Sequence, residues 1–144
     1  MDTKKIKQYF TALLVILALD LTWLNLIMDN FYNTQLISFN RPETVPIVAA
    51  LLVWVLMPLG IVFFVQQVSG NWKQVLVHGA LYGLILYGVY NLTNYAILEG
   101  WPLTMLIVDI IWGTCLCTLT SLAVFLVSNQ KPHRKGYVVH NSHK

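Results

Sequence analysis

Hydrophobic residues fall in four long, continuous stretches that are separated by short polar segments. The stretches run approximately from Tyr9 to Met28, Val45 to Val65, Val75 to Ile97 and Leu103 to Val127. Each is long enough to cross a hydrocarbon layer of about 30 Å, which takes roughly 20 helical residues. A membrane β-strand would instead alternate apolar and polar residues over about ten positions. The pattern therefore predicts four transmembrane helices.

The composition agrees with a chain whose main solvent is lipid. Of its 144 residues, 57% are hydrophobic and only 10% are charged, too few to cover a water-soluble core. The connections at Ser69–Asn71 and Glu99–Pro102 are short, which makes consecutive helices antiparallel neighbours. We expect an all-α integral membrane four-helix bundle. It is predicted to form a single domain over residues 1–130, followed by a basic, histidine-containing tail over residues 131–144.

The distribution of basic residues predicts the orientation of the helices, because Lys and Arg near helix ends favour the cytoplasmic side. One side of the predicted bundle receives Lys4, Lys5, Lys7, Lys73, Lys131, Arg134, Lys135 and Lys144. The other side receives Arg41 together with the acidic Asp29, Glu43 and Glu99. Both termini are therefore expected in the cytoplasm. So few charges on a membrane bundle make nucleic-acid binding a poor interpretation.

The longest connection runs from Asp29 to Thr44, on the side opposite the termini. Its aromatic residues Phe31, Tyr32 and Phe39 suit a position at the membrane interface. We expect this segment to lie on the bundle as a partial lid.

Two features of the helices are open to more than one interpretation. Pro58 lacks an amide proton and should kink the second helix or open its hydrogen bonding near Trp54, with Gly60 adding slack. This is either a structural bend or a gate. Gly79 and Gly83 form a small-xxx-small pair that lets another helix approach closely. The partner is either a helix of the same bundle or a second copy of the chain.

Polar residues inside the apolar stretches share one depth. Counting from the outer helix ends, Asp20 lies roughly 12 Å below Met28, and Asp109 roughly 9 Å below Leu103. Asn91 lies roughly 9 Å below Ile97, at the same level. Trp54 lies about 13 Å down the second helix and joins this layer. Because neighbouring helices run in opposite directions, the shared depth does not follow from sequence position alone.

This layer predicts a polar pocket in the outer half of the bundle. Ionisable groups inside a membrane face the bundle interior and often mark substrate or proton pathways. Carboxylates among aromatic rings bind cations through charge and ring quadrupole together. The alternative is that the aspartates accept hydrogen bonds from neighbouring helices and hold them together. The predicted binding residues are Asp20, Trp23, Tyr87, Tyr90, Asn91, Asn94, Asp109 and Trp112.

Other residues with chemical potential favour structural interpretations. His78 lies near the cytoplasmic start of the third helix, and no second histidine lies in a predicted span. The tail histidines His133, His140 and His143 are too dispersed for a zinc site, so no metal site is predicted. Cys115 and Cys117 point about 200° apart on one helix and are interpreted as small packing residues.

Several of these motifs together resemble a bacterial family of small four-helix membrane proteins catalogued as domain of unknown function 2177. The matching residues are Leu19-Asp20 with Trp23, Phe31-Tyr32, Tyr90-Asn91-Leu92-Thr93-Asn94, Gly100-Trp101-Pro102, and Val108-Asp109 with Trp112-Gly113-Thr114. The resemblance extends from about Tyr9 to Val127 and implies a multi-pass protein of the bacterial cytoplasmic (inner) membrane. It also implies that aspartate is usual at the position of Asn91, which leaves this chain with one fewer titratable group in the layer. The family name carries no activity.

Three functions are compatible with these observations. The first, which we favour, is a non-enzymatic protein that binds or transports a cation, a proton or a cationic small molecule through Asp20 and Asp109. The second is an enzyme, or its accessory subunit, that modifies membrane lipids with a carboxylate as general acid or base. The third is a structural partner in a larger membrane complex. The pattern thus points to the lipid bilayer as the environment and leaves open a cation or lipid ligand, a homo-oligomer or a membrane protein partner, with no cofactor identified.

Overall fold

The computed structural model describes residues 2–37, 39 and 46–129 of the chain. Its elements are α1 (Thr3–Thr22), the π-helical turn η1 (Trp23–Ile27), α2 (Asp29–Gln35), α3 (Ile47–Gly60), the π-helical segment η2 (Ile61–Gln66), α4 (Trp72–Ile97) and α5 (Leu103–Ser128). Together they include four helices that are long and apolar enough to cross a membrane, as predicted. The predicted tail and the loop residues Arg41 and Glu43 lie outside the described residues.

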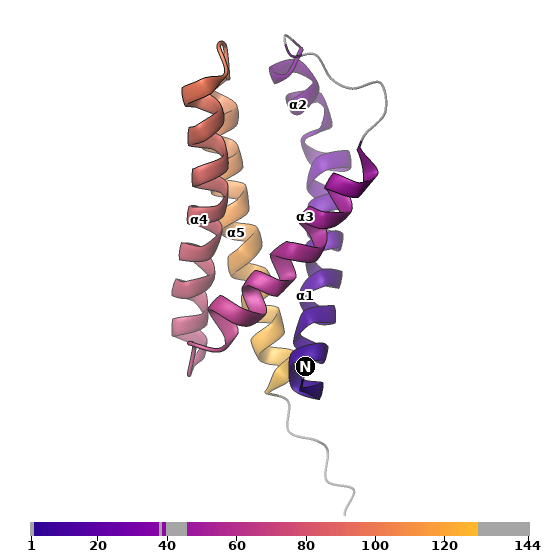
Figure 1. Ribbon diagram of the computed structural model, residues 1–144, viewed down its shortest axis with the longest axis vertical. Helices are drawn as coiled ribbons and strands as arrows, with labels where there is room; N and C mark the ends of the chain where they lie inside the picture. The colour runs from indigo at the N-terminus through magenta and orange to yellow at the C-terminus, as the bar shows by residue number, and fades with distance from the viewer. Residues whose placement is uncertain (1, 38, 40–45, 130–144) are drawn as a thin grey trace, which may run out of the picture.

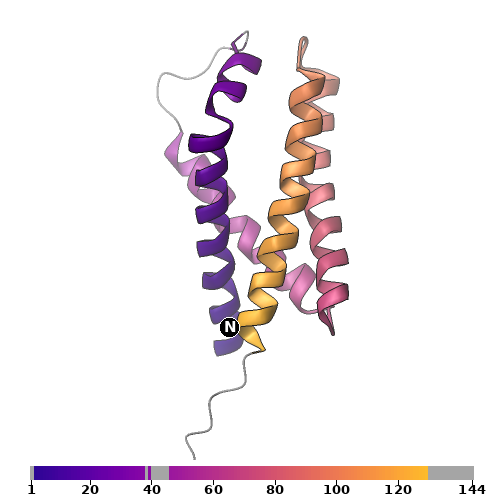
Figure 2. The same ribbon diagram turned by 180° about the vertical axis from the view of Figure 1, so that it is seen from behind.

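The four long helices alternate in direction along the chain (Figure 1). Helices α4 and α5 pack against each other, α1 packs on α5, and α3 packs on α1 while its continuation η2 reaches α4 and α5. Helix α3 therefore crosses the bundle diagonally, as both views show (Figures 1 and 2). We call the end with α2 and the α4–α5 turn the α2 end. The opposite end, where α1 begins and α5 finishes, is the terminal end.

Local sequence explains where α4 and α5 begin. Asn71 caps α4, because its Oδ1 accepts hydrogen bonds from the amides of Lys73 at 3.0 Å and Gln74 at 3.1 Å. The Gln74 side chain accepts in turn from the amide of Gly70 at 2.7 Å. In the turn before α5, Gly100 adopts a φ of 80°, which favours glycine, and Pro102 precedes the first helical residue.

The glycine pair of α4 brings it close to α5. A Cβ atom on Gly79 would lie 2.9 Å from Ser121 Oγ and 3.1 Å from Thr118 Cα. A Cβ atom on Gly83 would lie 2.8 Å from Thr114 Cα and would also meet the Gly113 carbonyl oxygen. Neither position has room for a side chain without a shift of α5. Of the two partners that the sequence left open, the structure therefore places α5 of the same chain against this pair.

Two of the four long helices end in a π-helical segment. In η1 the amide of Met28 donates to the carbonyl of Trp23 at 2.9 Å, five residues back. In the second case, α3 stays α-helical through Pro58 to Gly60 and widens only at Ile61. The irregular turns thus follow Pro58 instead of centring on Trp54. Widened turns of this kind rotate the side chains that follow relative to the helix that precedes them.

Helix α2 occupies part of the segment expected to cover the bundle. Asp29 lies in its first turn, where a carboxylate interacts favourably with the helix dipole, and accepts a hydrogen bond from Asn33 Nδ2 at 3.0 Å. Its aromatic residues do not simply face the membrane interface. Phe31, Tyr32 and Phe39 pack on a cluster formed by Trp101, Met105 and Leu106 at the start of α5. A hydrogen bond from Thr104 Oγ1 to Gln35 Oε1, 2.7 Å long, ties α2 to the same helix.

Candidate functional site

Asp20 on α1 accepts hydrogen bonds from tryptophans of two other helices. Trp54 Nε1 on α3 lies 3.2 Å from its Oδ2, and Trp112 Nε1 on α5 lies 3.3 Å from its Oδ1. Both indoles and the neighbouring Leu19 pack on the buried cluster of Ile16, Met57, Ile61, Val65, Leu116 and Cys117. The carboxylate therefore joins α1, α3 and α5 beside this buried cluster.

Asp109 on α5 has a separate pair of donors. The hydroxyl of Tyr32, on α2, donates to its Oδ1, and Asn91 Nδ2, on α4, lies 3.4 Å from its Oδ2. Asp109 is 8% exposed and Asn91 is fully buried. Burial, followed by the hydrogen bond to Asp109, raises the pKa of the Tyr32 phenol well above its usual range. Tyr32 is therefore a neutral donor at physiological pH.

A pair of tryptophans connects the two aspartates. The rings of Trp23, in η1, and Trp112 stack with their centroids 4.1 Å apart and their planes 4° apart. Trp23 Nε1 donates to the hydroxyl of Tyr32 at 3.1 Å, and Tyr32 donates to Asp109. Each tryptophan therefore interacts with the aspartate of the other helix and not with the aspartate three residues before it. Trp112, three residues after Asp109, serves Asp20, while Trp23, three residues after Asp20, serves Asp109 through Tyr32.

Asn91 has a buried side-chain oxygen that no donor of the described residues reaches. Its Nδ2 donates to the Tyr87 carbonyl at 3.2 Å as well as to Asp109. Because both of these partners are acceptors, they determine the orientation of the amide. Within the described part of the chain, Asn91 Oδ1 is buried and has no donor. Such unpartnered buried acceptors are uncommon in folded proteins.

The positive charges of the described residues lie far from the aspartates. In the ranges 2–37, 39 and 46–129 the basic residues are Lys4, Lys5, Lys7 and Lys73, all at the terminal end. Lys7 donates to the Val127 carbonyl at 3.1 Å. Asp20 follows Lys7 by a helical rise of about 20 Å. Both carboxylates therefore accept hydrogen bonds from neutral groups. None of the lysines in the described ranges lies beside them.

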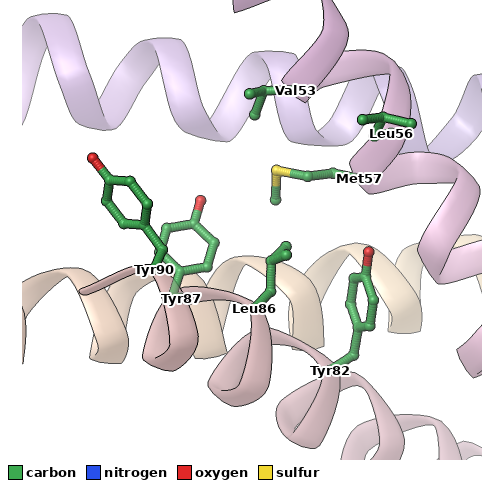
Figure 3. Close-up of a pocket in the computed structure, with 7 residues that line it drawn as sticks. All are labelled: Val53, Leu56, Met57, Tyr82, Leu86, Tyr87 and Tyr90. Atoms are coloured by element: carbon green, nitrogen blue, oxygen red, sulfur yellow. The ribbon is translucent and has the colours of Figure 1, made fainter. Parts of the chain in front are cut away.

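A cavity of about 430 Å³ lies between α3 and α4 (Figure 3). It is lined by Val53, Leu56, Met57, Tyr82, Leu86, Tyr87 and Tyr90. The hydroxyl groups of the three tyrosines point away from α4 toward the α3 side. Tyr87 joins the cavity to the aspartate layer, because its ring lines the cavity while its carbonyl binds Asn91. Its ring also packs directly over Gly113, one turn from Asp109 on α5.

The structure brings most of the predicted binding residues together, but not all around the aspartates. Asp20, Trp23, Asn91, Asp109 and Trp112 form the connected layer. The rings of Tyr87 and Tyr90 line the neighbouring cavity instead. Asn94 is half-buried, and no hydrogen bond joins its side chain to either aspartate in the part of the chain that the structure describes.

Two members of the layer are absent from the residues predicted to bind. Trp54 shares the depth of Asp20, and depth was therefore a usable signal, but only the crossing of α3 over α1 shows that it donates to Asp20. Tyr32 lies beyond the first apolar stretch, and no periodicity places its hydroxyl on Asp109. The missing information was the turn at η1, which folds α2 back over the bundle.

Comparison with known proteins gives one match. A family model described as "Predicted membrane protein (DUF2177)" matches residues 5–126. Neither a curated protein nor a solved structure matches the chain. The match covers all four candidate spans except the ends of the first and last, and it supports the membrane assignment made from length and hydropathy.

Proposed function

We propose that this chain, which belongs to the DUF2177 family of predicted membrane proteins, binds a small organic cation at Asp20 and Asp109. The binding site is the connected layer at the α2 end of the bundle, and the role is binding or transport without covalent chemistry. A proton is the smallest cation that the same carboxylates could take.

The observation that carries this proposal is the charge balance of the layer. Two carboxylates lie within helices long enough to cross a membrane, and their donors are Trp54, Trp112, Tyr32 and Asn91, all neutral. A charged side chain at the centre of a membrane helix costs on the order of 2.5–3.5 kcal/mol on insertion scales. Neutral hydrogen bonds offset part of this cost, whereas a bound cation would balance the charge itself.

The donors leave the carboxylates able to accept more. Among the described residues, each of the four carboxylate oxygens has one protein donor, and a carboxylate oxygen has a second lone pair. Trp112 contacts Asp20 Oδ1 through its N–H, and its ring stacks on that of Trp23. Tryptophan faces attract cations with an energy of about 0.5–2 kcal/mol, depending on solvation. Charge and ring quadrupole thus favour the same class of ligand.

We place the terminal end in the cytoplasm and the α2 end outside. This follows from Lys4, Lys5, Lys7 and Lys73, which lie at the terminal end, and from the exposed Glu99 and Asp29 at the other end. The layer then lies in the outer half of the membrane. The resemblance to a bacterial family favours the cytoplasmic (inner) membrane.

The proposal is tested by comparing charged and neutral ligands of one size. The full chain, in nanodiscs of zwitterionic phospholipid, is titrated with hexylammonium, hexyltrimethylammonium and hexanol, with tryptophan fluorescence as the signal and empty nanodiscs as the reference. We expect both cations to bind more tightly than the alcohol. Asp20→Asn and Asp109→Asn should each reduce this preference at least tenfold, which corresponds to about 1.4 kcal/mol.

Glu99→Gln is the matched control, since Glu99 is exposed in the α4–α5 turn and lies outside the layer. It should leave the preference for cations unchanged. Equal binding of hexanol and both cations by the wild-type chain would contradict the proposed function.

A further inference from the structure

The unpartnered oxygen of Asn91 says more about the ligand than the charge alone. Asn91 is 0% exposed, and its Oδ1 lacks a donor in the described part of the chain. Turning the amide over would not help, because Oδ1 would then face two acceptors, the Tyr87 carbonyl oxygen and Asp109 Oδ2. An acceptor buried without a partner has lost its hydrogen bonds to water. An N–H or O–H donor at this oxygen would therefore stabilise the layer.

An apolar space lies along α4 next to Asn91, although Asn91 itself does not line it. Tyr87 and Tyr90 precede Asn91 on α4 by four residues and one residue, and both line the cavity between α3 and α4. From Tyr90 to Tyr82 the cavity wall extends about 12 Å along α4, at 1.5 Å per residue. Its other lining residues are Val53, Leu56, Met57 and Leu86, which carry no charge (Figure 3). This space suits an alkyl chain or another elongated apolar group.

We infer that the ligand of the layer is an amphiphilic protonated amine, whose ammonium N–H donates to Asn91 Oδ1 beside Asp109 and whose apolar part occupies the α3–α4 cavity. This inference rests on the proposed function and narrows it to cations with at least one N–H. Alkylamines resemble a lysine side chain, with a pKa of about 10.4, and are charged at neutral pH. A quaternary ammonium has the same charge and no hydrogen to donate, so it leaves Asn91 Oδ1 unpartnered.

Access to Asn91 requires a side chain to move, because Asn91 is fully buried. Tyr90 precedes it on α4 and is 55% exposed, which gives its ring room to rotate. Its neighbour in the structure is Trp101, with ring centroids 6.3 Å apart in an edge-to-face arrangement. Tyr87 is held over Gly113 and between the helices. We therefore assign the moving ring to Tyr90.

The decisive measurement compares hexylammonium with hexyltrimethylammonium on the wild-type chain in nanodiscs. We expect the primary amine to bind at least tenfold more tightly. Equal affinities of the two cations would overturn the inference and leave the proposed function intact. A water molecule that already donates to Asn91 Oδ1 would give this result. If neither cation binds better than hexanol, the proposed function itself fails.

Replacing Asn91 tests the assignment of the acceptor. Asn91→Leu removes Oδ1, so it should abolish the preference for the primary amine while hexyltrimethylammonium keeps its affinity within a few-fold. A primary-amine preference that survives in Asn91→Leu contradicts the role of this oxygen. Should this variant not fold, the comparison on the wild-type chain still decides the inference without it.

A pair of valines on α3 tests the position of the apolar part. Val53 lines the cavity, whereas Val55, also exposed, does not. Val53→Trp fills the space and should weaken hexylammonium at least tenfold, with methylammonium affected much less. Val55→Trp is the matched control and should leave hexylammonium binding unchanged. An equal effect of the two substitutions would remove the cavity from the site.

Discussion

The indole rings of Trp23 and Trp112 lie parallel, with centroids 4.1 Å and planes 4° apart. One ring belongs to the π-helical turn that follows α1, and the other to α5. Each ring also donates its N–H, Trp112 to Asp20 and Trp23 to Tyr32. The stack therefore joins the hydrogen bonds of Asp20 to those of Asp109.

Loss of the Trp112 N–H should destabilise the bundle. Trp112→Phe keeps an aromatic ring against Trp23 but leaves Asp20 Oδ1 without its donor. Asp20 is half-buried, so losing this partner should cost about 1 kcal/mol, the lower end of the range for a buried acceptor, and thermal unfolding in detergent should begin at a lower temperature. Trp72→Phe is the control, since Trp72 is 52% exposed at the start of α4. Equal stability of Trp112→Phe and wild type would show that this hydrogen bond contributes nothing.

Tyr32 should hold α2 against the bundle. Tyr32→Phe removes the donor to Asp109 and the acceptor of Trp23 Nε1. Hydrogen bonds to charged groups contribute about 1.5–3 kcal/mol, so the amides of α2 should exchange with solvent about tenfold faster or more. Hydrogen exchange read by mass spectrometry measures this. Tyr95→Phe, an exposed tyrosine of α4, should leave α2 unchanged. Unaltered exchange in Tyr32→Phe would argue that packing on Trp101 alone positions α2.

The raised pKa of Tyr32 predicts a loss of stability at high pH. Burial raises this pKa above the ordinary value near 10, so between the two values the folded state holds a proton that the unfolded state has released. The contribution of Tyr32 to the free energy of unfolding is present in full below about pH 10 and is lost as the pH rises above it. Measurements of the free energy of unfolding between pH 8 and about 11 should show this decline. Tyr32→Phe should decline less steeply than wild type, and identical slopes would contradict the prediction.

Two glycines of α4 should respond in opposite directions to alanine. At Gly83 a Cβ atom would meet the backbone of α5, 2.8 Å from Thr114 Cα, whereas at Gly88 it would meet nothing within 4 Å. Overpacking costs about 1–3 kcal/mol, so Gly83→Ala should lower the unfolding temperature. Gly88→Ala should raise it slightly, because alanine is favoured over glycine in helices by up to about 1 kcal/mol. If both substitutions stabilise the protein, α4 and α5 do not approach as closely as described.

The proposed orientation is testable by labelling single cysteines in a chain with Cys115→Ser and Cys117→Ala. A membrane-impermeant maleimide should label Glu99→Cys, in the α4–α5 turn, on intact cells. Gln67→Cys, after η2 at the terminal end, should react only once the cells are opened. The reverse pattern would place the layer in the inner half of the membrane.

The sequence by itself determined the four helices and the depth of the layer. Within hydrocarbon, a segment must satisfy its backbone hydrogen bonds internally, so long apolar runs such as the one ending at Val127 can be assigned as helices. A fixed rise per residue then brings Asp20, Asn91 and Asp109 to one level. The hydrogen bond between Asn91 and Asp109 is in agreement with that estimate.

Only the tertiary structure decided which side chains meet within that level. A helix surrounded by lipid is apolar on nearly every side, so its periodicity does not reveal which face turns inward. The crossed partners of Trp23 and Trp112, the return of Tyr32 to Asp109 and the cavity beside Tyr87 all depend on helix rotation and crossing. These are set by the π-helical turns and by the close contact of α4 with α5 at Gly83. Such contacts join residues that are distant in the chain, so the local sequence pattern does not predict them.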